Sequence, residues 1–319
     1  MKKNRLKRVS VLFLCVALLL TVAGCSGKTT EQTAQSDSST VGSTAYPLTI
    51  TDDLGNEVQL DAEPQRIVSL APANTEILYA LGLDERVVGR TDYCNYPEAA
   101  SQVESVGNYN APNVEKIIGL TPDLILSAST TFLTEDVRAQ IEATGTKVIA
   151  LDPQSIDAVE TDIKLVGQIC NVQDKAAELI NSMETKRQAI KDKTAQAQES
   201  KKVFIDLGEY YTAGPGSLLD SMLTELNAVN IAGETGQVWT SMTTETIIAD
   251  NPDVYISLYA TADEIKQVAG FDQMKAVQDN AVYAYGPLSP EADQIQRGGP
   301  RIVDGLELLA KDIYPELMQ

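Results

Sequence analysis

The chain has 319 residues, enough for two domains of ordinary size that each bury a hydrophobic core. It carries 45 acidic against 25 basic residues, and the net charge of −20 excludes a nucleic-acid-binding protein, which needs a basic surface. The sequence contains no histidine, which excludes His-dependent catalytic triads and His-ligated metals or haem.

The first 24 residues predict a targeting segment that takes no part in the fold. Five basic residues precede an apolar run over residues 9–23, which is shorter than the about 20 residues that span a bilayer. We therefore expect cleavage and not an uncleaved anchor, leaving 20 basic against 45 acidic residues, a net charge of −25. The run ends in VAGC and resembles a bacterial lipoprotein signal, in which Cys25 is lipidated.

Residues 25–45 are rich in Ser, Thr and Gln and predict a flexible tether. Residues 46–154 then predict an α/β lobe that begins with a hairpin around Gly55. A helix through Leu81, with Asn74 or Thr75 as its cap, follows the first buried strand. Alternating strands and helices are typical of a parallel sheet covered by helices. The strands are expected at residues 66–70, 86–89, 123–127 and 147–151.

One phrase occurs twice, 130 positions apart. Residues 115–127 read EKIIGLTPDLILS, and residues 245–257 read ETIIADNPDVYIS. Each copy predicts a short helix with an acidic first turn, ended before a proline and followed by a buried strand. The repeat indicates two similar lobes, the second over residues 200–319.

No strand pattern occurs over residues 155–199, where apolar residues recur at helical spacing. This segment predicts one long rigid helix that connects the lobes, or two helices with a break near Asn171. Cys94 and Cys170 remain once Cys15 is removed with the signal and Cys25 is lipidated. They are consistent either with one disulfide or with two buried thiols.

The sequence has no GxSxG, P-loop, HExxH or GxGxxG motif and no evident carboxylate pair, so we expect no enzyme. A surface-tethered enzyme is the remote alternative. Aromatic residues, which are few, follow predicted strand ends or precede the repeated helices. Singly, each fits an ordinary surface or core residue. Tyr109 and Trp239, however, both lie six residues before a repeated glutamate, and this match favours a ligand site.

Four stretches make the sequence similar to a known family: RIVSLAPANTEILYALGL, VVGRTDYCNYP, NVEKIIGLTPDLIL and GGPRIVDGLELLA. The family is that of the substrate-binding proteins of bacterial ABC importers with two α/β lobes joined by a rigid helix. Its members bind cobalamin, haem or ferric siderophores, and the resemblance is strongest to the cobalamin receptors. The resemblance covers residue 46 to the C-terminus.

The resemblance implies that the ligand lies between the lobes. The implied ligand-binding residues are Tyr93, Tyr109, Tyr211, Trp239, Arg297 and Asp293. One further pocket tryptophan of the cobalamin receptors corresponds to Ala128 here, and their disulfide has no equivalent pair. Glu115 and Glu245 match the two surface carboxylates that bind the permease; alternatively, they only stabilise the helix dipole.

The ligand can be argued partly from residue chemistry. A ferric siderophore is usually anionic and calls for several cations, whereas only Arg297, Arg301 and Arg90 are expected at the mouth. Haem usually takes a His or Tyr ligand; the sequence has no His, but a Tyr could serve. Aromatic contacts with one arginine suit a corrin. We therefore expect cobalamin, with haem or a siderophore as the alternative.

Other partners follow from the same reasoning. We expect no protein cofactor and no metal site. The partner is expected to be the ABC permease dimer with its ATPases, and the protein itself to be a monomer. The resemblance places it on the extracytoplasmic face of the cell membrane, attached through lipid alone.

Overall fold

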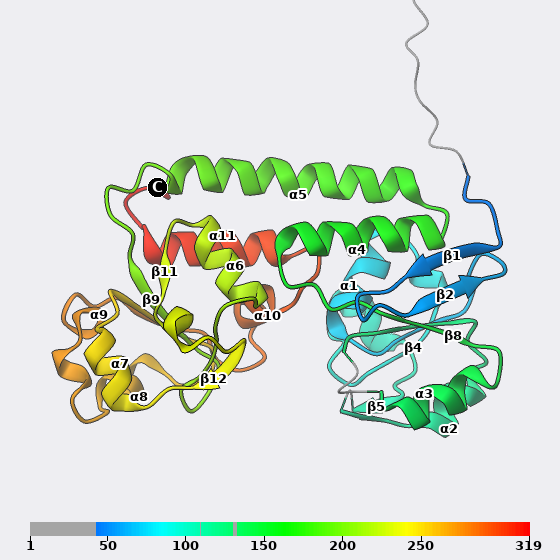
Figure 1. The fold of residues 1–319 in the computed structure, drawn as a ribbon, viewed down its shortest axis with the longest axis horizontal. Coiled ribbons are helices and arrows are strands. Elements are labelled where there is room, and N and C mark those ends of the chain that lie inside the picture. Colours follow the sequence, from blue (N-terminus) through cyan, green and yellow to red (C-terminus); the bar gives the residue numbers. More distant parts are fainter. Residues whose placement is uncertain (1–42, 109, 130–132) are drawn as a thin grey trace, which may run out of the picture. The chain divides into compact units, whose positions relative to one another are not determined.

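The computed structural model describes residues 43–108, 110–129 and 133–319 (Figure 1). The predicted signal peptide, Cys25, almost all of the tether and Tyr109 lie outside the described residues. Within the described part of the chain, no helix combines the length and apolar character needed to cross a membrane.

The first lobe is built on a parallel sheet with the strand order β4-β3-β7-β8. Its strands are β3 (Ile67–Ser69), β4 (Val87–Arg90), β7 (Leu124–Ser127) and β8 (Lys147–Ala150). Its helices are α1 (Pro72–Ala80), α2 (Val114–Gly119) and α3 (Glu135–Glu142). The predicted hairpin is present as β1 (Leu48–Thr51) and β2 (Glu57–Leu60), and β5 (Gly107–Asn108) pairs with β6 (Ala111–Pro112).

The second lobe repeats this topology with the strand order β11-β9-β13-β14. Its parallel strands are β9 (Lys202–Asp206), β11 (Val229–Asn230), β13 (Val254–Ser257) and β14 (Val282–Ala284). Its helices are α6 (Leu218–Glu225), α7 (Thr244–Asp250), α8 (Ala262–Lys266), α9 (Lys275–Gln278), α10 (Pro290–Gln296) and α11 (Ile302–Ile313). In both lobes the first strand lies between the second and the third. The predicted fold class, an α/β protein with two similar parallel-sheet lobes, is confirmed.

The repeated phrase forms the same unit in each lobe. Its helix is α2 in the first lobe and α7 in the second, capped by the side chains of Asn113 and Thr243. Each helix ends before a proline, and each is followed by a fully buried strand, β7 or β13. Because both strands occupy the third place of their sheets, the repeat reflects equivalent positions in the fold.

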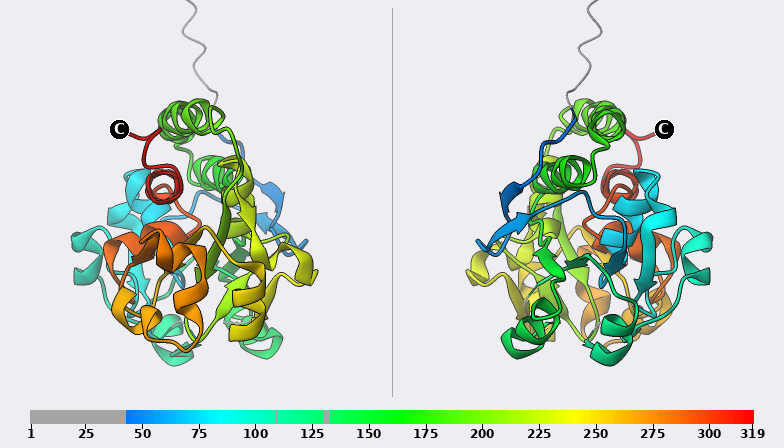
Figure 2. Two further views of the ribbon diagram at one scale, coloured as in Figure 1. Left: turned by 90° about the vertical axis from the view of Figure 1, so that its left-hand side faces the viewer. Right: turned by 90° about the vertical axis from the view of Figure 1, so that its right-hand side faces the viewer.

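A helical hairpin connects the two sheets. α4 (Ile156–Ile169) ends near Asn171, which has a φ of 57°, and α5 (Gln173–Thr194) continues alongside it (Figure 1). Of the two predictions for this segment, the one with two helices and a break near Asn171 is correct. The longer of the two helices is α5. In the end-on views of Figure 2, α5 lies beside both α4 and α11.

Arg187 fixes α5 to its neighbours. Its guanidinium, only 8% exposed, lies 2.5 Å from Asp157 of α4 and 2.6 Å from Glu225 of α6. A charge buried with two carboxylates is stabilised by hydrogen bonds that replace its hydration. The helical hairpin is therefore attached to the second lobe by ion pairs as well as by apolar packing.

Two expectations are changed by the structure. Helix α1 begins at Pro72, with Ala71 as its N-cap, so Asn74 and Thr75 do not cap it. Both residues lie within the helix and have buried side chains. The Asn74 amide donates to the Ser127 carbonyl, and the Thr75 hydroxyl donates to the Ser69 hydroxyl. Cys94 and Cys170 are free, buried thiols, so of the two alternatives the disulfide is wrong.

Candidate functional site between the lobes

The position of the site follows from the strand order. In an open parallel sheet, ligands bind outside the carboxyl ends of the strands, where successive connections leave in opposite directions. That point lies between β3 and β7 in the first lobe and between β9 and β13 in the second. Tyr93 follows β4, Tyr211 follows β9, and Arg297 follows α10.

Tyr211 and Trp239 form an exposed aromatic pair. Tyr211 begins β10 (Tyr211–Ala213), which pairs in antiparallel fashion with β12 (Trp239–Ser241). Their ring centroids are 6.1 Å apart, and the ring planes differ by 12°. The side chains are 42% and 49% exposed, a costly position for two large rings in a protein with few aromatics. The pair therefore offers a flat apolar surface for a ligand.

A charge cluster joins the two lobes, and we call it the interlobe cluster: Glu76, Asn95, Asp293, Arg297 and Arg301. Glu76, on α1 of the first lobe, is only 2% exposed. Arg301, at the start of α11, donates to its carboxylate through Nε at 2.8 Å and Nη2 at 2.7 Å. Arg297 donates to the same carboxylate through Nη1 at 3.1 Å. Two guanidinium groups from one lobe thus share one buried carboxylate from the other.

Asp293 balances the second positive charge. Its Oδ2 lies 2.8 Å from Nη2 of Arg297, one helical turn away, and accepts a hydrogen bond from the Asn95 amide at 3.3 Å. Asn95 in turn accepts from Nη1 of Arg297 at 2.7 Å. The cluster therefore contains two carboxylates and two guanidinium groups and carries no net charge.

The loop after β4 also contacts the interlobe cluster. The Tyr93 carbonyl accepts from Arg297 at 3.4 Å, and the guanidinium of Arg301 lies 3.8 Å above the centroid of the Tyr96 ring. Burial lowers the pKa of Arg301, but hydrogen bonds to Glu76 outweigh this effect, and the pKa is raised overall. Arg301 therefore holds the loop and α1 together.

The predicted site residues thus fall into distinct groups. Tyr93, Arg297 and Asp293 meet in or beside the interlobe cluster, and Tyr211 and Trp239 meet in the aromatic pair. Tyr109 lies outside the described residues. Sequence reasoning missed Glu76, although an acid on the buried face of the apolar stretch ANTEIL was an available signal.

Glu115 and Glu245 occupy equivalent surface positions. Each is exposed in the first turn of its helix, α2 or α7. Hydrogen bonds to its own backbone N–H and to the Thr243 hydroxyl lower the pKa of Glu245, so it remains ionised at neutral pH. The two lobes therefore present one fixed negative charge each at the same point of the repeated unit.

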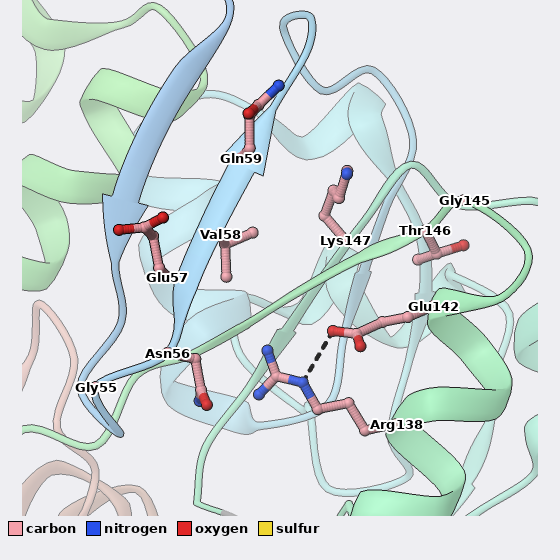
Figure 3. A pocket seen from close by; sticks show the side chains of 10 residues that line it. All are labelled: Gly55, Asn56, Glu57, Val58, Gln59, Arg138, Glu142, Gly145, Thr146 and Lys147. Carbon is pink, nitrogen blue, oxygen red and sulfur yellow. Dashed lines mark hydrogen bonds and ion pairs between the residues drawn. The ribbon is translucent and has the colours of Figure 1, made fainter.

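A separate hollow of about 650 Å³ lies between the β1–β2 hairpin and β8 (Figure 3). Arg138, its most prominent cation, is ion-paired with Glu142 at 2.9 Å and donates to the Val148 carbonyl. Figure 3 shows a polar, open lining without aromatic rings. Its chemistry differs from that of the strand-end site, and we assign no ligand to it.

The family is established by comparison with known proteins. A model of the periplasmic binding protein family matches residues 67–288. The chain belongs to this family. It is 35% identical over 323 residues to an uncharacterised ABC transporter substrate-binding lipoprotein of Bacillus subtilis, YvrC, covering 97% of this chain and 98% of that one.

Two further relatives differ in the ligand that their names give. A protein named as cobalamin-binding, from Halobacterium salinarum, is 28% identical over 308 residues, covering 94% of this chain and 83% of that one. A solved structure of a possible iron-binding, periplasmic solute-binding protein from Staphylococcus epidermidis is 31% identical, with a TM-score of 0.70. That match covers 79% of this chain and 100% of the solved one. All three relatives are named as binding proteins, for a transported substrate, for cobalamin or for a solute.

Proposed function

We propose that this protein is a lipid-anchored extracytoplasmic receptor that captures cobalamin between its lobes and delivers it to an ABC permease. Membership of the periplasmic binding protein family and the similarity to an ABC transporter substrate-binding lipoprotein support the transport role. The VAGC sequence at residues 22–25 supports lipidation of Cys25.

The choice of cobalamin over a siderophore rests on the balance of charges at the site. Arg297 and Arg301 are neutralised by Glu76 and Asp293. The third arginine expected at the mouth, Arg90, donates to the carbonyls of Thr91 and Ser101. An anionic siderophore would have to compete with these carboxylates and carbonyls for the three arginines.

A corrinoid needs no such rearrangement. Its large ring offers apolar faces to the Tyr211–Trp239 pair, and its amide side chains can bond to polar groups without adding charge. Haem carries two propionates and needs an axial ligand, which in this chain cannot be a histidine. The balanced interlobe cluster thus favours a ligand of little net charge.

Binding spectra test this proposal. The purified protein is titrated with cyanocobalamin, hydroxocobalamin, haemin and a ferric hydroxamate siderophore, each followed by absorbance and by Trp239 fluorescence. Trp239 is the sole tryptophan of the sequence, so a change in emission reports on the aromatic pair. Binding of a corrinoid at micromolar concentration or below supports the proposal; siderophore binding without corrinoid binding overturns it.

Delivery to the permease is assigned to Glu115 and Glu245. The two-lobed repeat places one exposed carboxylate on each lobe, which suits a partner with two-fold symmetry. Charges of this kind mainly set the rate and orientation of docking. The glutamates are therefore expected to affect uptake and not ligand affinity.

A further inference from the structure

Two more apolar residues are exposed at the carboxyl edge of the second sheet. Tyr259 follows β13 and is 55% exposed, and Leu288 follows β14 and is 63% exposed. Neither was identified from the sequence as a ligand residue. Together with Tyr211 and Trp239 they are four of the large apolar side chains that the second lobe leaves exposed to solvent.

The sheet places these residues in one row. The strands β9, β13 and β14 are adjacent and parallel, so their carboxyl ends lie at the same edge. Tyr211, Tyr259 and Leu288 come shortly after those three ends in that order. Neighbouring strands are about 4.8 Å apart, so the row spans about 10 Å before Trp239 extends it.

Tyr259 lies at the point where the strand connections diverge. It follows β13 directly, beside the turn that leaves β9. The Tyr259 side chain lies beside Gly208 of that turn, where an added Cβ would lie 3.4 Å from the Tyr259 Cγ. The Ser257 hydroxyl accepts from the backbone N–H groups of Tyr259 and Ala260, which holds the chain in its bend. The exposed ring is therefore held in a defined position.

An aromatic hollow of about 290 Å³ adjoins this ring. It is lined by Tyr210, Tyr255 and Tyr259 and has the exposed acid Glu209 at its rim. Its lining surface is largely apolar, and two of the residues that line it are joined by a hydrogen bond of 2.7 Å from the Tyr255 hydroxyl to Asp206. A hollow of this size accepts a side chain of a ligand that lies across the row.

Three non-glycine residues at or beside the row have a left-handed backbone conformation. Leu288 has a φ of +62°, a conformation in which a leucine costs about 1 kcal/mol or more relative to glycine. Glu209 and Tyr210, in the turn before Tyr211, have φ values of +52° and +62°. Residues in this conformation cluster at ligand-binding sites, so the three positions are consistent with a binding role.

We infer that Tyr211, Trp239, Tyr259 and Leu288 form one platform that receives the flat face of a macrocyclic ligand, with Tyr259 at its centre. The inference rests on the proposed function and extends the ligand site by two residues. In the first lobe, small residues, Ala128 and Ser129, follow the corresponding strand β7.

The test compares Tyr259→Ala, Tyr259→Phe and Leu288→Ala with Val229→Ala. Val229 is a matched control because it is also apolar and 46% exposed in the second lobe, but it pairs with Lys202 at the opposite edge of the sheet. All four variants retain Trp239, so its fluorescence reports binding in each. Thermal unfolding of each variant verifies that the fold is intact.

The platform predicts that Tyr259→Ala and Leu288→Ala weaken corrinoid binding, by on the order of tenfold for the tyrosine, because a buried aromatic contact is lost. Tyr259→Phe, which keeps the aromatic ring, is expected to weaken binding less than Tyr259→Ala does, and Val229→Ala is expected to bind as the unsubstituted protein does. If the unsubstituted protein binds a corrinoid and both alanine variants bind it equally well, the platform is wrong while the proposed function stands.

The experiment also distinguishes the case in which the choice of cobalamin is wrong but the platform is right. If the unsubstituted protein binds haemin but no corrinoid, and Tyr259→Ala weakens haemin binding, the platform stands and the choice of cobalamin is wrong. Binding of a ferric siderophore alone would overturn both.

Discussion

The carboxylate of Glu76 in the first lobe lies 2.7 Å from Nη2 of Arg301 in the second; the Glu76 side chain is 2% exposed and that of Arg301 is 12% exposed. Since Arg297 also contacts this carboxylate, the residue that the resemblance assigns to ligand binding is part of the contact between the lobes. Ligand contact and lobe contact therefore share one arginine.

Removing the Glu76 charge should destabilise the protein. Glu76→Gln leaves two guanidinium groups with Asp293 as their only carboxylate in the interlobe cluster, and the free energy of unfolding should fall by about 3 kcal/mol. Urea denaturation measures this change. Glu104→Gln is the control, because its ion pair with Lys116 is exposed and should be worth less than about 1 kcal/mol. Equal effects of the two substitutions would contradict a structural role for Glu76.

The aromatic pair should account for a large part of ligand affinity. Trp239→Ala removes one half of the Tyr211–Trp239 stack, and we expect Kd to rise roughly thirtyfold, about 2 kcal/mol. Trp239→Phe should recover most of the loss because it restores an aromatic face. Absorbance titration with cyanocobalamin gives both constants. If Trp239→Ala bound the ligand with unchanged affinity, the aromatic pair would not be part of the ligand site.

The permease-docking role should separate uptake from binding. The double variant Glu115→Ala/Glu245→Ala should bind ligand normally and support several-fold slower uptake by cells, because the paired surface charges are gone. Glu135→Ala/Asp263→Ala is the matched control, as these exposed acids also lie in the first turns of helices, one in each lobe. Normal uptake by the first double variant would refute the docking role.

Asp162, on α4, should make stability depend on pH. Burial, together with the nearby carboxylates of Asp53 and Asp152, raises its pKa to about 8. In the unfolded chain this carboxyl loses its proton near its ordinary pKa of 3.8, so the folded state holds the extra proton between those two values. The stabilising contribution is therefore fully present below about pH 4 and is lost as the pH rises towards 8.

Asp162→Asn should remove this pH dependence and stabilise the protein at pH 8 by about 1–3 kcal/mol, because a carboxylate with an unpartnered buried Oδ2 is replaced by a neutral amide. The midpoints of urea denaturation at pH 5 and pH 8, compared between this variant and the unsubstituted protein, measure the change in pH dependence. Asp174→Asn, an exposed acid on α5, should leave the pH dependence unchanged. If the stability of Asp162→Asn changed more steeply with pH than that of the unsubstituted protein, the predicted effect of Asp162 would be wrong.

The two thiols should be inert in the folded protein. Cys94 and Cys170 are both 0% exposed, and burial raises the pKa of the Cys170 thiol to about 12, so little nucleophilic thiolate is present at neutral pH. A thiol reagent such as DTNB should react with them only after denaturation. Rapid reaction of the native protein, or a mobility change on reduction, would contradict the buried free thiols.

Local sequence patterns were sufficient to predict the two-lobed fold and the positions of its main elements. The repeated phrase carried this information because its signals are local: a capped first turn, a proline stop and a run of buried apolar residues each act within a few positions. Exposed aromatic residues beside strand ends could also be predicted, since strand ends and aromatic spacing are visible in one dimension.

Which of those residues meet depends on the tertiary structure. Trp239 reaches Tyr211 through a β10–β12 pairing that no local pattern indicated, and Glu76 meets Arg301 across 225 positions of the chain. Tyr259 was missed because its importance comes from the order of β9, β13 and β14 in the sheet. Ion pairs and strand order depend on the packing of distant segments, so they are fixed by the fold as a whole.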